Sequence, residues 1–61
     1  MNISDIIAER LLSRDGIAVI WQLHVRAAAS HRRGNWLSAV ALTGVAEAAE
    51  RFVAADLRHA R

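Results

Sequence analysis

Apolar residues recur along this chain at helical spacing, in three segments separated by two short polar stretches. Such spacing is typical of amphipathic helices, and no stretch alternates apolar and polar residues as a half-buried strand would. We expect helices over residues 3–13, 17–32 and 36–59. The pattern therefore predicts an all-α fold. Residues 1–61 form a single helical domain in which the second and third helices make a hairpin and the first is a short N-terminal helix.

The polar stretches contain residues that end and start helices. Arg32 and Arg33 suit the negatively polarised C-terminus of a helix. Gly34 then suits a left-handed cap, and Asn35 can cap the helix that follows. The earlier stretch, residues 13–16, is a weaker break, because its glycine costs only about 1 kcal/mol relative to alanine inside a helix. One long bent helix over residues 3–32 is therefore the alternative.

Each expected helix has an apolar side. On the first helix this side consists of Ile3, Ile6, Ile7 and Leu11. On the second helix the main stripe consists of Ile17, Ile20, Trp21, His24, Ala27, Ala28 and His31. On the third helix the stripe consists of Leu37, Val40, Ala41, Gly44, Ala48, Phe52 and Ala55. The second helix has further apolar residues outside its stripe, and a helix that is apolar nearly all round is usually buried.

The length of the chain makes these faces hard to cover. A domain of 61 residues buries only about 60% of the surface that its unfolded chain exposes. The chain has no cysteine, so neither a disulfide nor a cysteine-based metal site can stabilise it. We therefore expect a homo-oligomer. A dimer is the simplest form, because two hairpins make a four-helix bundle.

Small residues recur along the third helix. Glycine in a helix interior is destabilising, and the spacing of Gly44 and Ala48 matches the small-x-x-x-small pattern of close helix contacts. The pattern is consistent either with ordinary alanine-rich packing or with a specific close contact. We expect the second helix of the hairpin, before any other subunit, to make this contact. The candidates for helix packing or oligomer contact are Trp21, Leu37, Ala41, Gly44, Ala48 and Phe52. Trp21 and Trp36 are most simply core anchors, and exposed interface positions are the alternative.

A cluster of cationic residues around the second break is the best candidate for partner binding. Arg32, Arg33 and Trp36 lie close together in sequence, and Arg26 lies nearly two turns earlier. Arginine contacts phosphate or carboxylate, and tryptophan stacks on bases or packs in interfaces. The net charge of only +2 makes nucleic acid the weaker interpretation. The simplest interpretation of the cluster is a C-terminal helix cap with solvated arginines, and the same patch could meet an acidic protein surface.

Metal binding, catalysis and membrane insertion have little support. His24 and His31 are about 10 Å apart along one straight helix, too far to share a metal ion. Neither a nucleophile elbow nor a phosphate-binding glycine loop is present. The longest apolar run, residues 17–29, is interrupted by polar residues and is too short to span a membrane. Charged residues stand where a signal peptide would be apolar. We therefore expect a soluble, cytoplasmic protein without cofactor, metal or transmembrane segment.

The sequence thus favours a small non-enzymatic interaction protein, an oligomeric regulator or inhibitor that binds another protein. In size and architecture it resembles phage-encoded inhibitors and bacterial regulatory adaptors, an analogy and not a family match. The alternative function is a small nucleic-acid-binding protein that uses the arginine cluster, doubled by dimer symmetry. A third and weaker hypothesis is peripheral membrane association through the isoleucine side of the first helix.

Overall fold

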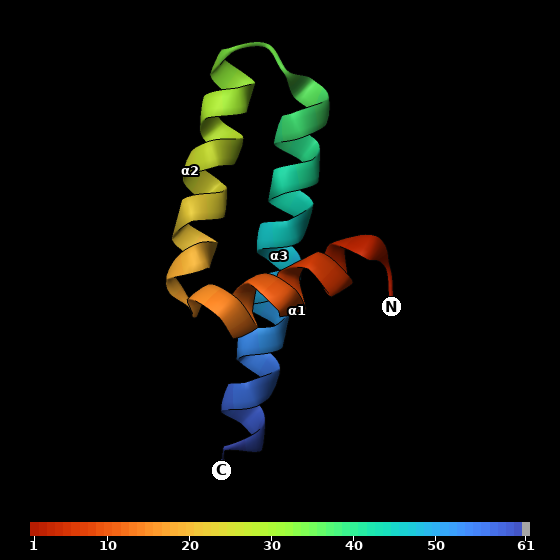
Figure 1. Ribbon diagram of the computed structural model, residues 1–61, viewed down its shortest axis with the longest axis vertical. Helices are drawn as coiled ribbons and strands as arrows, with labels where there is room; N and C mark the ends of the chain where they lie inside the picture. The colour runs from red at the N-terminus through yellow and green to blue at the C-terminus, as the bar shows by residue number, and fades with distance from the viewer. Residues whose placement is uncertain (61) are drawn as a thin grey trace.

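The computed structural model describes residues 1–60, and this part of the chain folds into three helices with no strand. They are α1 (Ile3–Asp15), α2 (Ala18–Arg32) and α3 (Trp36–His59). Figure 1 shows α2 and α3 side by side as an antiparallel hairpin, with α1 crossing α3 near its middle and the last turns of α3 extending beyond α1. The prediction of an all-α fold is confirmed.

The start and end of α1 are set by local chemistry. The Asn2 side-chain oxygen accepts a hydrogen bond from the Asp5 backbone N–H at 3.0 Å, and the Asp5 carboxylate accepts one from the Asn2 N–H at 3.4 Å. This reciprocal pair is a capping box. At the other end Gly16 has φ 79°, a conformation that side-chain-bearing residues rarely adopt. The chain therefore breaks here, and the alternative of one bent helix over residues 3–32 is wrong.

Two exposed side chains form a charge pair at the end of α1. The Arg14 guanidinium donates hydrogen bonds to the Asp15 carboxylate, the shortest at 2.9 Å. These bonds hold the pKa of Asp15 below its usual range and raise that of Arg14. Because both side chains are exposed, the pair contributes little to stability.

The hairpin turn has the geometry that its residues predict. Gly34 has φ 78°, and its N–H donates to the His31 carbonyl at 3.0 Å. The next N–H, that of Asn35, donates to the Ser30 carbonyl at 2.9 Å. The Asn35 side chain then accepts from the Ser38 N–H at 3.2 Å and caps α3. The turn thus satisfies backbone groups at the end of α2 and at the start of α3.

The core is made mostly of alanine. The apolar residues with no exposed surface are Ala8, Ala46, Ala48 and Ala49. The larger nearly buried side chains in the same cluster are Val19, Leu23 and Val45. Partly buried residues complete this cluster: Leu11, Leu12, Ile20, Leu42 and Phe52. Alanine removes little apolar area from water, so the core contributes less stabilisation than a core of leucines of the same size would.

The buried seam differs from the stripes that the sequence indicates. On α2 the buried positions are Val19, Leu23, Ala27 and Ser30, so of the expected stripe only Ala27 is buried and Ile20 partly buried. On α3, Leu37 is 87% exposed and Ala41 is exposed, whereas Ala39, Val45, Ala46 and Ala49 are buried. Both helices are apolar on more than one side. Small residues line the seam between them and allow a close approach.

Helix α1 contacts α3 at Gly44 and Arg51. A Cβ atom built on Gly44 would be 3.5 Å from the Ser4 hydroxyl oxygen. The Arg51 guanidinium donates a hydrogen bond to the Asp5 carboxylate at 3.0 Å and so joins α3 to α1. The close neighbour of Gly44 is therefore in α1, whereas Ala48 belongs to the same buried cluster as Val19 and Leu23 of α2, so both helices contact this stripe.

The isoleucine side of α1 is largely exposed. Ile3 is 67% exposed, and Ile6 and Ile7 are 38% and 39% exposed. Ala8 takes the buried position, and Leu11 and Leu12 pack against the core. The sequence indicates the isoleucines as the apolar side of α1, yet Ala8 is the residue that is buried. A small residue at this position lets α1 cross the alanine-rich surface of α3 closely.

Candidate protein-interaction surface

The side of the hairpin that α1 does not cover contains two adjoining hollows. The first has a volume of about 510 Å³ and lies between the loop-proximal halves of α2 and α3. The second has a volume of about 490 Å³ and lies toward the start of α2. Every residue that lines them belongs to α2 or α3 or, in one case, immediately precedes α2. We call this surface the interaction face, and its main side chains are Ile17, Trp21, His24, His31, Trp36, Val40, Glu47, Glu50 and Leu57.

Large apolar side chains on the interaction face are exposed to water. Trp21 is 73% exposed and Trp36 is 60% exposed. Ile17, Leu57 and Val40 are 65%, 68% and 71% exposed. Neither tryptophan is therefore a core anchor, and the prediction of a core role is wrong for both. Exposed tryptophan on a hollowed apolar surface is typical of protein interfaces.

Trp36 is held in place by a neighbouring ring. Its ring centroid lies 4.5 Å from that of His31, with the two planes at 87°. This edge-to-face contact joins the start of α3 to the last turn of α2. The indole is thus both exposed and oriented, so that it loses less side-chain entropy when a partner covers it.

A contact between an imidazole and a carboxylate bridges the interaction face between the hollows. The His24 Nε2 atom lies 3.1 Å from a Glu50 carboxylate oxygen, and both side chains are about half exposed. His31 and Glu47 line the first hollow as well. On this face, therefore, the imidazoles belong to α2 and the carboxylates to α3. An exposed pair of this kind contributes at most about 1 kcal/mol, so its main effect is on the pattern of polar groups across the face.

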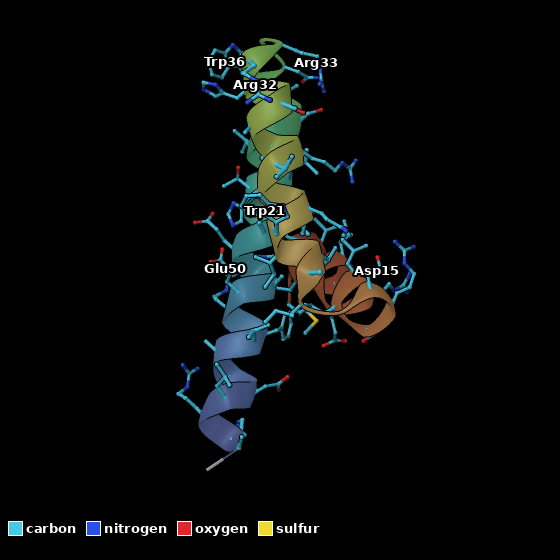
Figure 2. The ribbon with its side chains drawn as sticks, turned by 90° about the vertical axis from the view of Figure 1, so that its left-hand side faces the viewer. Asp15, Trp21, Arg32, Arg33, Trp36 and Glu50 are labelled. Carbon is cyan, nitrogen blue, oxygen red and sulfur yellow. The ribbon has the colours of Figure 1, made fainter. Side chains whose placement is uncertain are left out.

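The predicted arginine cluster is brought together only in part. Arg32, Arg33 and Trp36 lie at the loop end of the hairpin, whereas Arg26 is exposed further along α2. Arg33 donates a hydrogen bond to the Ser30 hydroxyl at 3.4 Å. Within residues 1–60 none of these arginines has a carboxylate within ion-pair distance. Figure 2 shows Trp36 and Glu50 projecting from the side away from α1, and Arg33 from the opposite side.

The candidates for packing or oligomer contact fall into separate places. Trp21 lies on the interaction face, and Gly44 lies at the edge of its first hollow and against α1. Ala48 and Phe52 line a small hollow beside the start of α1. Leu37 and Ala41 are exposed and line neither hollow of the interaction face.

Sequence reasoning did not single out Val40, Glu50 or Leu57 for this surface. One feature of the sequence could have indicated this surface: both helices carry more large apolar residues than an alanine-lined seam can bury.

Metal binding, membrane-spanning helices and known relatives give no further indication of function. The described residues contain no group of three side chains placed to bind a metal ion. None of the helices in residues 1–60 combines the length and apolar character needed to cross a bilayer. Comparisons with protein-family models, with curated proteins and with solved structures found no match.

Proposed function

We propose that this chain is a non-enzymatic helical interaction protein that self-associates and binds another protein as a regulator or inhibitor. The observation that carries the proposal is the interaction face, where Trp21 and Trp36 stand exposed beside two apolar hollows. Monomeric proteins rarely leave large apolar patches in water unless a partner covers them. The phage or bacterial character of such a regulator rests on analogy of size alone.

The loop end of the hairpin is the surface we propose for the other protein. Arg32 and Arg33 have no carboxylate partner in the described chain, and Leu37 is 87% exposed nearby. Arginine and tryptophan are enriched among residues that dominate binding energy. A partner that fits this end has an apolar pocket bordered by acidic side chains, because it must meet both kinds of group.

Nucleic acid remains the alternative ligand for the same arginines. Its support is weak, because Arg26 lies nearly two helical turns before Arg33 and the nearby interaction face carries Glu47 and Glu50. Phosphate binding would require several cations on one surface and would weaken steeply with added salt. The test below separates the two ligands.

Affinity capture from the native host tests the proposal. The tagged wild-type chain is compared with the double variant Arg32→Glu, Arg33→Glu and with Arg58→Glu, a control in which the exposed arginine lies at the far end of α3. We expect one host protein to be retained by the wild type and the control after nuclease treatment, and to be lost by the double variant. Equal retention by all three chains would refute the loop-end site. Loss of all retention after nuclease treatment would favour nucleic acid.

A further inference from the structure

The folded chain leaves more surface in water than a monomer of its mass ordinarily does. Its accessible surface is 4582 Å². The general relation between mass and surface gives about 3,900 Å² for a monomer of 6.7 kDa. The excess of roughly 700 Å² is close to the approximately 800 Å² that each partner buries in a standard protein interface. The excess accessible surface is thus about as large as the area that one subunit buries in a dimer.

The interaction face gathers many of the large apolar side chains that remain in water. It holds five of the eleven large apolar side chains that are exposed in the described chain, including both tryptophans. The face carries no arginine among its lining residues, so two copies can approach without facing guanidinium groups. A second copy presents the same protruding tryptophans and the same hollows, which is the requirement for a self-complementary two-fold contact.

The distribution of imidazoles and carboxylates selects the orientation of the two copies. The imidazoles of His24 and His31 lie on α2, and the carboxylates of Glu47 and Glu50 lie on α3. A two-fold axis that runs along the helices places α2 of each copy against α3 of the other, so that imidazoles face carboxylates. An axis across the helices places α3 against α3, so that carboxylates face carboxylates, an arrangement that costs binding energy.

From these observations we infer that a second copy of the chain covers the interaction face, with α2 of each copy against α3 of the other. The inference rests on the self-association proposed above and names its surface and orientation. The product is a four-helix bundle in which every helix has antiparallel neighbours. Because the axis runs along the helices, both hairpin loops lie at the same end. Arg32 and Arg33 of both copies, which line neither hollow, then form one composite surface, and the binding site for the other protein is incomplete in a single copy.

Sedimentation equilibrium of matched variants tests the surface. Ala28 is exposed and lines the first hollow, whereas Gln22 is exposed on the same helix and lines neither hollow. We expect the wild type and Gln22→Glu to be dimers at micromolar concentration. Ala28→Glu should raise the dimer Kd roughly a hundredfold or more, because its carboxylate is buried against those of the partner's α3. Circular dichroism checks that each variant is folded.

Trp21→Ala provides a second test of the surface, because its side chain is largely exposed in the single chain and its loss should leave the helices intact. We expect it to weaken the dimer. A wild-type monomer at about 100 µM, or equal Kd values for Ala28→Glu and Gln22→Glu, would overturn the inference.

Distances between spin labels test the orientation, and the absence of native cysteine allows single-site labelling. Labels at Arg32→Cys and, separately, at Arg58→Cys, two exposed positions that line neither hollow, should both give distances of about 15–20 Å between copies, because each end lies beside its equivalent. An axis across the helices would instead separate both label pairs by about 30 Å or more, given the length of the face. Long distances at both sites would therefore overturn the composite surface.

The two proposals fail in different ways. If the chain is monomeric but still retains a host protein through Arg32 and Arg33, the dimer inference and the proposed self-association fail, and the proposed binding of another protein stands. If the labelled dimer forms as described but retains no host protein, the dimer stands and the regulatory function fails.

Discussion

Leu23→Ala is expected to remove much of the stability of the fold. Leu23 is 3% exposed and belongs to the same cluster as Val19, Val45 and Ala46. Truncation of a buried leucine to alanine costs about 2–5 kcal/mol, and the cost is greatest where neighbours cannot move into the cavity. The neighbouring alanines cannot reach into the space, because they have no side chain beyond Cβ. We therefore expect a loss of about 3–4 kcal/mol.

The expected loss is large compared with the total free energy of unfolding of the chain. At roughly 0.05–0.15 kcal/mol per residue, a chain of 61 residues has about 3–9 kcal/mol to lose. Urea denaturation followed by circular dichroism measures the free energy of unfolding. It must be done at one fixed protein concentration, because self-association adds to apparent stability. Leu37→Ala is the matched control, since Leu37 is 87% exposed and should lose less than about 0.5 kcal/mol. A loss below about 1 kcal/mol for Leu23→Ala would refute the packing described here.

Two further predictions concern α3 and the end of α1. Gly44→Ala should stabilise the fold by about 1 kcal/mol in urea denaturation, because alanine favours the helix and its Cβ would meet Ser4 at an ordinary contact distance of 3.5 Å. Destabilisation by this variant would show that α1 lies closer to α3 than described. Asp15→Asn should slightly lower the melting temperature at neutral pH. Because the pKa of Asp15 is depressed by the Arg14 hydrogen bond, the stability it contributes is present above its unfolded pKa and is lost as pH falls through the folded value. A difference between Asp15→Asn and the wild type that persists below that pH would contradict this assignment.

The turns were predictable because their chemistry is local. Gly34 and Asn35 act through their own backbone and side chain, so the residue types alone indicate the left-handed cap and the helix start. The buried seam was not predictable in the same way. A helix with apolar residues on several sides fits more than one buried stripe, and only the arrangement of the other helices decides among them.

The exposure of the tryptophans and the acidic partner of Arg51 could not be predicted from the sequence for the same reason. Size and apolar character favour Trp21 and Trp36 as core anchors, yet the close, alanine-lined seam of the hairpin has no room for them. Arg51 has Glu47 one turn away, and this spacing favours a local pair. The guanidinium instead meets Asp5, 46 residues away in sequence. A contact across the fold cannot be deduced from spacing along one helix.

The alanine core has a consequence for how stability depends on temperature. The heat-capacity change of unfolding arises mainly from apolar surface that becomes hydrated, and it is typically about 12–15 cal/mol/K per residue. This chain has both tryptophans and several large aliphatic side chains already in water when folded. Its own unfolding should therefore have a smaller heat-capacity change and a flatter stability curve. Calorimetry would detect self-association as a steepening of that curve with protein concentration, because the dimer places the same side chains out of water.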